Sequence, residues 1–572
     1  MTAGAILWAM PGAAQLTPAP AQVPGLPSRG QIEQPAPPAA APSTARVSGR
    51  DAVPTPPCPL AASPLKVRID SVRFVAVGRD AVPAAITDVL AGIAPPQTGE
   101  QPIAVVCTIR DTANAALAKA GFVASVQVPP QKISDGTLLL SVVLARVTEV
   151  RVHGDAGRYR SVLAGAIARL RTLDPLNERD AERLLLLAGD VPGLDIQLSL
   201  RPAGGAPGDV IGDLTIVTQR ATVLANLQNY GSQALGRETG YARIDLNAVF
   251  LPDDTLYLGG STTGQLREQQ VAQFGYRVGQ ASSGFTAGPR LTYAWSRPDV
   301  GALDLRSRSL IAGFDISQPL VRSVRDTLSL AFGFELIEQK IRVHDDNGSS
   351  PLNLDKLREA YVRVDGRTSA RRPDGLDAYT IGASVEARRG MAILGASRRG
   401  TLTASGYAPS RFEGDPEAFV VRGNLNTLAR IDGRFSLSQA VMAQWADHPL
   451  LNFDEQALGN LTVGLGYDPG ANSGDRFVGS HAEGRFDFRM PRGMPVQLFA
   501  FTDAVWIWNL DSFSTENDRL LRSVGGGFRA RLPGPMLLEM TYARPLDRAL
   551  SINERRAAPR LLFSLTAQIS PK

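Results

Sequence analysis

From about residue 221 onward, the chain is built from short segments in which apolar and polar residues alternate. Each segment is about ten residues long and ends in turn-forming Gly, Asp, Asn or Pro. In "PRLLFSLTAQIS", Leu561, Phe563 and Leu565 share one face, whereas Ser564 and Thr566 share the other. A period of two indicates β-strands. About sixteen such segments follow one another, and an even number of strands, apolar outside and polar inside, is typical of a transmembrane barrel.

Soluble β-sandwiches also alternate and are the alternative. Two features favour a barrel: the segments form one unbroken array, and the faces expected to point inward carry Arg and Ser. In "SVGGGFRARL", Arg529 and Arg531 lie opposite Phe528 and Ala530. The sequence contains no run of about 18 apolar residues, as a transmembrane helix would need. We therefore predict a mainly β fold, with a barrel of about 16 strands over residues 220–572.

Charge and composition argue against several classes of function. The 572 residues carry a net charge of +5, but Lys and Arg do not gather into runs with interleaved aromatics, so nucleic-acid binding is not favoured. No Ser/His/Asp set, phosphate-binding loop or metal-ligand spacing is found, and the four histidines are scattered. We predict neither an enzyme nor a cofactor or metal site.

The first 64 residues predict export followed by a linker. Residues 1–16 have a short apolar core followed by small residues, which resembles the later part of a secretory signal peptide. Residues 17–64 are rich in Pro and Ala, cannot bury a core and are expected to be extended. No amphipathic helix is evident before residue 66.

Two small α+β modules are predicted between the linker and the barrel, over residues 65–150 and 151–219. Each combines helical spacing with strands joined by Gly-containing turns. In the second module, Asn177 is a suitable N-cap and Gly189 a suitable helix stop. Their lengths are typical of small domains.

Two cysteines, Cys58 and Cys107, allow two interpretations. In an oxidising compartment they would pair and tie the linker to the first module. The alternative is two free thiols. Their spacing fits no zinc motif.

Several motifs, in order, carry a resemblance to a known family. These are "AGFVASVQVPPQKISDGTLLLSVV", "LLLAGDVPGLDIQLSLRPAGGAPGDVIGDLTI", "NLQNYGSQALGRETG", "VGLGYDPG", "FAFTDAVWIWN" and "SVGGGFRARLPGPMLLEMTYARPLD". Together they resemble two-partner-secretion outer-membrane transporters of the haemolysin and filamentous haemagglutinin type. The resemblance implies that the two modules are periplasmic POTRA (polypeptide-transport-associated) modules.

The resemblance also assigns a loop near residues 446–477 that folds back into the barrel. Its motif residues are Gly464, Leu465, Gly466, Tyr467, Asp468, Pro469, Gly470, Asp475 and Arg476, and the facing strand motif is Phe499, Phe501 and Asp503. In the family an Arg of the loop meets this Asp. Here the Arg position is Leu465, and the residue two after the Asp, usually Gly, is Val505.

This departure predicts a different contact at Asp503. A guanidinium can hold a carboxylate through two hydrogen bonds, whereas Leu cannot. Asp503 would then need water, Tyr467 or another cation such as Arg476, and Val505 would favour apolar contact with Leu465. We favour a loop docked by packing and hydrogen bonds; the alternative is a weakened latch.

The resemblance implies an outer-membrane pore that exports one large, partly unfolded partner protein from the periplasm to the cell surface. The modules would capture the partner by strand addition or in a groove. Besides the partner, only outer-membrane lipid is expected to be bound, and the chain is expected to be monomeric. The alternatives are an outer-membrane protein insertion factor of the same superfamily and a passive porin-like channel.

Overall fold

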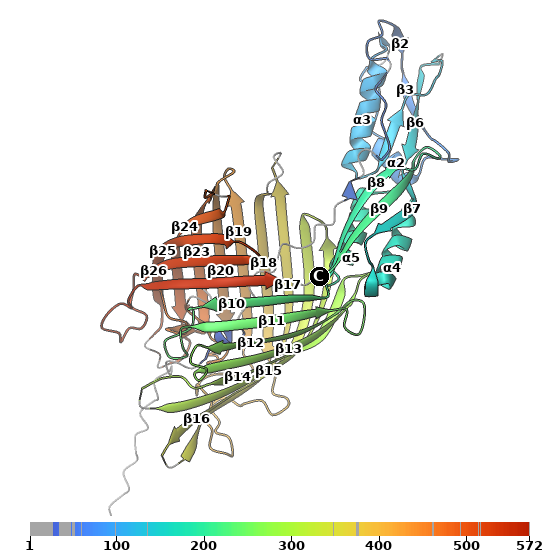
Figure 1. Ribbon diagram of the computed structural model, residues 1–572. Coiled ribbons are helices and arrows are strands. Elements are labelled where there is room, and N and C mark those ends of the chain that lie inside the picture. Colours follow the sequence, from blue (N-terminus) through green and yellow to red (C-terminus); the bar gives the residue numbers. More distant parts are fainter. Residues whose placement is uncertain are drawn as a thin grey trace, which may run out of the picture.

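The computed structural model describes residues 27–33, 47–48, 52–58, 60–97, 99–133, 135–301, 303–346, 348–372, 377–459, 463–491, 493–512, 514 and 516–570. The signal-peptide-like segment 1–16 lies outside the described residues, as does most of segment 17–64. Figure 1 shows a wide barrel and a narrower arm of small sheets and helices at one end of it.

Within the described residues, sixteen strands close into one barrel, so the predicted fold is confirmed. Neighbours pair antiparallel, and β10 closes the ring against β27. The strands are β10 (Ala221–Gln228), β11 (Thr239–Asn247), β12 (Asp254–Thr263), β13 (Gln269–Gln280), β14 (Phe285–Ser296), β15 (Asp304–Arg322), β16 (Asp326–Asp345), β17 (Gly348–Arg371), β18 (Asp377–Gly390), β19 (Phe419–Arg430), β20 (Phe435–Ala446), β23 (Arg476–Arg489), β24 (Pro495–Trp508), β25 (Arg519–Leu532), β26 (Met536–Pro545) and β27 (Arg560–Ile569).

The outer wall of the barrel carries large apolar side chains. Phe274, Phe314 and Phe332 are 41%, 48% and 47% exposed. On two of the same strands, Ile311 and Ile337 point the other way and are fully buried inside. This alternation is the pleat of a β-strand with one face in an apolar solvent. Among the described residues, no helix is long and apolar enough to cross a membrane.

Three outward tryptophans lie close to the ends of their strands: Trp295 on β14, Trp445 on β20 and Trp506 on β24. All three ends are remote from the arm, and the indoles are 38–45% exposed. Tryptophan rows mark the level where a bilayer's apolar core meets its polar surface. The apolar belt of the wall therefore ends at this level.

Two small α+β units form the arm, as predicted. The first has the sheet β3 (Ser71–Ala76), β6 (Thr137–Leu144) and β5 (Ala124–Gln127), the pair β2 (Lys66–Arg68) and β4 (Glu100–Pro102), and the helices α2 (Ala84–Leu90) and α3 (Val105–Lys119). The second has the sheet β1 (Val47–Ser48), β8 (Leu194–Pro202), β9 (Asp209–Thr218) and β7 (Arg146–His153), with η1 (Gly157–Tyr159), α4 (Arg160–Arg171) and α5 (Glu178–Gly189). Because β7 begins at Arg146 and pairs with β9, the second sheet starts a few residues before the predicted boundary at 150.

The second unit is attached to the short turns of the barrel. Asp190, after α5, makes an ion pair of 2.6 Å with Arg322 at the end of β15. Glu182 accepts a hydrogen bond of 2.7 Å from the backbone N–H of Val324. Arg169 of α4 donates to the carbonyl of Ser282 at 2.7 Å. These contacts fix which end of the barrel faces the arm.

Cys58 and Cys107 are joined as a disulfide, with 5.8 Å between their Cα atoms. Cys107 lies in α3, and Cys58 lies in the chain that leads into the first unit. Arg110, also on α3, donates to the carbonyl of Pro56 at 2.9 Å. The end of the predicted linker is thus held against the first unit.

Candidate functional site in the barrel lumen

The connection between β20 and β23 lies against the inner wall of the barrel, where the backbone of Leu465 binds Asp503 of β24. It contains the short pair β21 (Gln456–Ala457) and β22 (Ser473–Gly474). Asp475, at its end, is fully buried and accepts hydrogen bonds from Arg411 at 2.6 Å and from the backbone N–H groups of Leu450 and Leu510 at 2.7 Å. A carboxylate with this many donors fixes the base of the loop.

Asp503 receives three donors at the place where the loop approaches β24. The backbone N–H of Leu465 donates at 2.9 Å, the hydroxyl of Ser523 at 2.5 Å, and Nδ1 of His481 lies 2.7 Å away. His481 stands directly opposite Asp503 on the neighbouring strand β23. The carboxylate is 1% exposed, so these donors replace the hydration it has lost.

Of the predicted partners of Asp503, Arg476 and Tyr467 bind other groups. Arg476 instead donates to the carbonyl of Ala446 at 3.0 Å and lies over the ring of Trp445. The hydroxyl of Tyr467 donates to another carbonyl. Sequence reasoning missed His481 because only the register of β23 against β24 places it opposite Asp503, and alternation alone does not give that register.

From His481 a row of charges continues along the lumen wall. Its Nε2 lies 3.6 Å from Glu483, and Arg529 binds both oxygens of that carboxylate at 2.6 and 2.9 Å. Arg529 also donates to Glu539 at 2.8 Å and lies 4.1 Å above the ring of Phe499. Glu483 of β23, Arg529 of β25 and Glu539 of β26 thus alternate in sign, so each of these charges has a partner.

The side chain of Leu465 packs on the aromatic residues of the facing strand motif. It lies against the cluster of Phe499 and Phe501, together with Tyr230. Val505 belongs to a different cluster, with Val463 and Tyr467, so the predicted contact between Val505 and Leu465 is wrong. The reason is the turn at Gly464 (φ +91°), which separates the two sides of the loop.

Close approach to β25 and β26 requires glycine at position 466. A Cβ there would lie 2.8 Å from Cβ of Ser523 and 2.8 Å from the nitrogen of Pro545. Next to it, Tyr467 is fully buried and donates to the carbonyl of Arg522 at 2.8 Å. Burial raises the pKa of Tyr467 to about 12, so the phenol keeps the proton it donates.

An arginine from β27 holds the loop motif from the other side. Arg560 donates to the carbonyl of Tyr467 at 2.8 Å and lies 3.3 Å from the carboxylate of Asp468. Asp468 also accepts the backbone N–H of Gln233 at 2.6 Å. The loop therefore has an arginine contact, but the arginine comes from the wall.

A short helix, α1 (Arg29–Ile32), lies inside the barrel, which corrects the prediction of an extended segment at this place. Ser28 and Gln31 form a capping box, and Ile32 is buried with Val271, Ile337 and Phe453. Four residues are too few to show a helical period, and so short a helix depends on the contacts around it. The one local signal in the sequence was the capping-box spacing of Ser28 and Gln31, which is weak in a Pro-rich segment.

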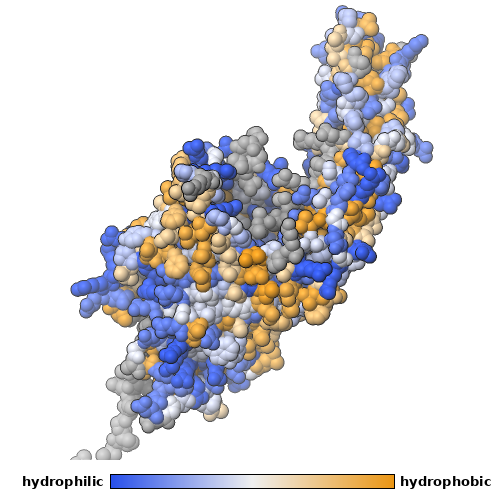
Figure 2. Space-filling view, viewed as in Figure 1, coloured by the Kyte–Doolittle hydropathy of each residue, from blue (hydrophilic) through white to orange (hydrophobic). Residues whose placement is uncertain are grey.

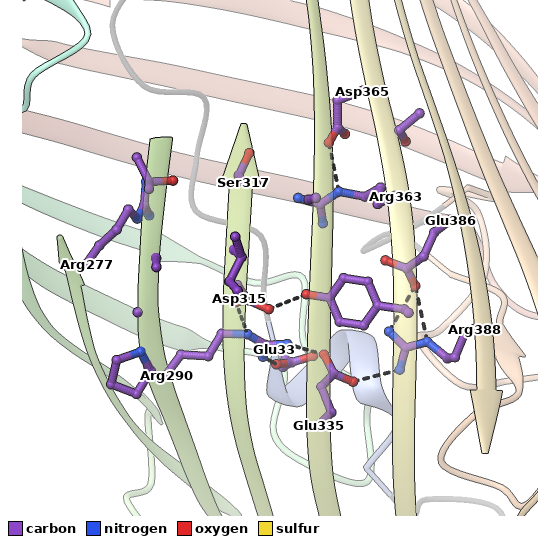
Figure 3. Close-up of a pocket in the computed structure, with 18 of the residues that line it drawn as sticks. Glu33, Arg277, Arg290, Asp315, Ser317, Glu335, Arg363, Asp365, Glu386 and Arg388 are labelled. Atoms are coloured by element: carbon purple, nitrogen blue, oxygen red, sulfur yellow. Dashed lines mark hydrogen bonds and ion pairs between the residues drawn. The ribbon is translucent and has the colours of Figure 1, made fainter. Parts of the chain in front are cut away.

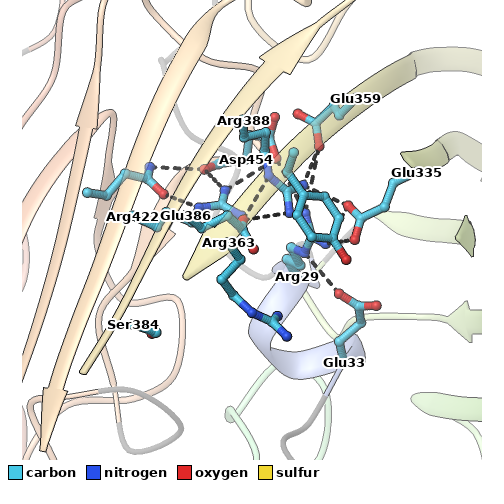
Figure 4. A network of polar contacts seen from close by, with 12 residues as sticks. Arg29, Glu33, Glu335, Glu359, Arg363, Ser384, Glu386, Arg388, Arg422 and Asp454 are labelled. Atoms are coloured by element: carbon cyan, nitrogen blue, oxygen red, sulfur yellow. Dashed lines mark hydrogen bonds and ion pairs between the residues drawn. The ribbon is translucent and has the colours of Figure 1, made fainter. Parts of the chain in front are cut away.

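Arg29 joins α1 to the wall and lies close to the inward loop (Figure 4). It donates to both oxygens of Glu335 at 2.8 and 2.7 Å and lies 3.8 Å from Asp454 of the loop. Glu335 is also bound by Arg388 at 2.7 Å, and Glu33, after the helix, by Arg290 at 2.7 Å. Desolvation alone would disfavour these charges, but each carboxylate here has arginine partners.

Gln31 is the direct link between α1 and the loop motif. Its side-chain amide lies 3.5 Å from the carbonyl of Pro469, and Gly470 follows with φ +74°. The helix and the loop thus occupy the lumen together. Both are held to the wall by ion pairs and hydrogen bonds and also by buried apolar side chains, such as Ile32 with Ile337 and Val463 with Val505.

A cavity of about 630 Å³ remains on the side of α1 nearer the arm (Figure 3). Charged residues of both signs line it, including Arg277, Asp315, Arg363, Asp365 and Glu386. Such a surface stays wet and offers no large apolar area. Among the described residues, no group of His, Cys, Asp and Glu could hold a metal ion.

Comparison with known proteins agrees with this architecture. Residues 215–530 match the family described as haemolysin secretion/activation protein ShlB/FhaC/HecB. Among solved structures, CdiB from Escherichia coli aligns with a TM-score of 0.68 and 16% identity, over 90% of this chain and 93% of that one. CdiB from Acinetobacter baumannii aligns with a TM-score of 0.62 and 16% identity, over 91% and 94%. At such identities the two structures support the fold alone.

A comparison with curated proteins gives no match. The family match covers more than half of the chain, including most of the barrel and the inward loop. The chain therefore belongs to the ShlB/FhaC/HecB family of haemolysin secretion/activation proteins, which are outer-membrane transporters and not enzymes.

Proposed function

We propose that the chain exports a large, partly unfolded partner protein from the periplasm to the cell surface through its barrel lumen. The observation that carries this proposal is how the lumen is filled. Segment 27–33 and the inward loop are held partly by hydrogen bonds and ion pairs, as at Arg29–Glu335 and Leu465–Asp503, and partly by buried apolar side chains such as Ile32. The polar contacts can be replaced by hydrogen bonds to water or to a passing chain.

The arm supports a periplasmic capture step. It stands at the end of the barrel that has the short turns (Figure 1). The strand ends that carry Trp295, Trp445 and Trp506 lie at the other end. Short turns face the periplasm in barrels of this kind. The edge of β8 already accepts a strand, because Val47 and Ser48 pair with it in parallel. An extended segment of the partner would bind such an edge by the same backbone bonds.

The cavity on the arm side of α1 suits an unfolded chain in transit. Its charges of both signs, such as Arg363 and Asp365, are paired with one another at 2.9 Å. A surface of this kind binds neither acidic nor basic segments strongly, so a passing chain would not be held at one place. This chemistry fits a polypeptide whose sequence varies along its length.

The seam between β10 and β27 favours passage through the lumen over lateral release of a substrate into the membrane. Six residues of β10 pair with six of β27. Within this seam the amide of Asn226 donates to the hydroxyls of Ser564 and Thr566 at 2.8 Å. Asn229 adds bonds to Leu561 and Phe563 at 2.9 and 2.8 Å. An insertion factor that works through this seam would have to break all of them.

Deleting the gene tests the proposal. One large secreted protein should disappear from the medium and cell surface and accumulate or be degraded in the periplasm, while the amounts of other outer-membrane barrels stay unchanged. Quantitative mass spectrometry of the medium, the cell surface and the periplasm measures the amounts of the secreted protein and of the other barrels. A general fall in other barrels would support the insertion factor instead. A complementing copy of the gene should restore secretion.

A further inference from the structure

A cluster of cations lies on the outside of the barrel, at the ends of β13–β16 remote from the arm. We propose that this cationic patch binds the phosphates of an anionic glycolipid in the outer leaflet of the membrane. The patch surrounds a hollow of about 560 Å³. Its cationic lining residues are Arg267, Arg297, Arg306, Arg308, Lys340 and Arg342, and no carboxylate is among the residues that line it.

Strand pairing places like charges directly opposite each other. Arg308 faces Lys340, and Arg306 faces Arg342, across the β15–β16 ladder. Like charges in such positions destabilise a sheet unless an anion lies between them. All four side chains belong to the outward set, since the residues between them, such as Ser307 and Ile341, are buried. The register of β15 against β16 therefore brings these like charges together.

The acidic side chains nearby neutralise only part of the patch. Asp304 binds Arg297 at 2.8 Å and Arg306 at 3.0 Å. Glu338, one step down β16 from Lys340, is bound by Arg358 at 2.8 Å. Among the described residues, no carboxylate forms an ion pair with Arg308, Lys340 or Arg342.

Two of these cations meet an extracellular loop. Arg342 donates to the hydroxyl of Tyr407 at 2.8 Å, and the ammonium of Lys340 lies 4.9 Å above the same ring. Arg342 also donates to Ser349. These neutral contacts orient the side chains and leave their charges uncompensated.

The height of the patch on the wall identifies its occupant as a lipid. Trp295, which marks the end of the apolar belt, is directly opposite Arg308. Below it on the outer face lie Phe314 and Phe332, both nearly half exposed. Figure 2 shows the same change, with apolar residues along the wall and hydrophilic ones towards the end remote from the arm. Acyl chains would contact the belt while the head group reaches the cations.

Phosphate is the chemistry that the patch fits best. Guanidinium groups bind phosphate oxygens in pairs, and several cations around one hollow can hold more than one phosphate. This inference requires the chain to lie in the outer membrane but does not depend on protein export, so either proposal can fail alone.

The test is binding of lipopolysaccharide to the purified full chain in neutral detergent. Binding is measured by native mass spectrometry and by the rise in the midpoint of thermal unfolding. Three probes are compared: lipopolysaccharide, the same lipid after enzymatic removal of its phosphates, and inorganic phosphate. We expect binding and a raised midpoint with the first probe alone. Equal binding of the dephosphorylated lipid, or saturation by inorganic phosphate at the same concentration, would overturn the proposal.

A double variant, Arg308→Gln with Lys340→Gln, should bind lipopolysaccharide about thirtyfold more weakly. The matched control, Arg398→Gln with Arg399→Gln, removes two exposed charges from the loop between β18 and β19 and should bind like the wild type. The charge-preserving variant, Arg308→Lys with Lys340→Arg, should also bind and shows that the positions tolerate substitution. Unchanged affinity in the double variant would contradict the proposal.

Discussion

At the scale of single residues, Asp503 explains how the inward loop is held without an arginine at position 465. The carboxylate takes its donors from three elements: the loop backbone at Leu465, Ser523 on β25 and His481 on β23. Leu465 adds apolar packing on Phe499 and Phe501. The contacts correspond to a loop docked by packing and hydrogen bonds, the interpretation favoured from the sequence.

Replacing His481 by Ala should loosen the loop. Asp503 would lose the imidazole that lies 2.7 Å from it while staying buried, which costs about 3 kcal/mol. We expect faster protease cleavage within residues 447–475 and a lower unfolding midpoint. His448→Ala is the control, because that side chain is 50% exposed and pairs with Asp447 at the surface. Equal cleavage rates in the two variants would show that His481 does not hold the loop.

Leu465→Arg restores the residue usual in the family, yet it should not strengthen the latch. Asp503 already accepts three donors, and the substitution removes apolar contact with Phe499 and Phe501. We expect the free energy of loop docking to fall by about 1 kcal/mol, with secretion of the partner little changed. A marked gain in protease resistance or secretion would support the weakened-latch alternative.

The sequence was sufficient to single out Leu465 and Asp503 but not to join them to His481. Motif spacing places the first two in one loop and one facing strand, whereas the partner of Asp503 depends on strand register. The outward pairs Arg306–Arg342 and Arg308–Lys340 were missed for the same reason.

At the scale of elements, the local sequence determines the conformation of the strands much more than it determines that of α1. Sixteen strands could be predicted because each repeats a period of two over about ten residues. Helix α1 has four residues and a capping box, and the wall residues that stabilise it lie hundreds of positions away, as Glu335 does. Tertiary contacts decide its conformation.

Arg29→Ala should release α1 from the wall. The variant loses both bonds to Glu335, worth about 2 kcal/mol together, while Glu335 keeps Arg388 and Arg290 as partners. In planar lipid bilayers the purified chain should then open about thirtyfold more often than the wild type. Arg399→Ala, in an exposed loop, serves as the control. An unchanged current record would mean that Arg29 does not hold the helix in place.

At the scale of the whole molecule, the lumen is the proposed route of export. The arm is fixed at the turn end by contacts such as Asp190–Arg322, and the seam is closed by Asn226. Segment 27–33 and the inward loop fill the space between the two openings. For a polypeptide to pass, both segments must be released from their contacts with the barrel wall.

Locking segment 27–33 in the lumen tests this claim most directly. Cysteines replace Pro27 and Gln339, whose carbonyl and amide are 3.1 Å apart, in a chain that also carries Cys58→Ser and Cys107→Ser. A short cross-linker that a reductant cleaves joins them in living cells, and each single-cysteine variant serves as a control. We predict that secretion of the partner stops when the cross-link is complete and returns after reduction. Secretion at the control rate from a fully cross-linked chain would contradict export through the lumen.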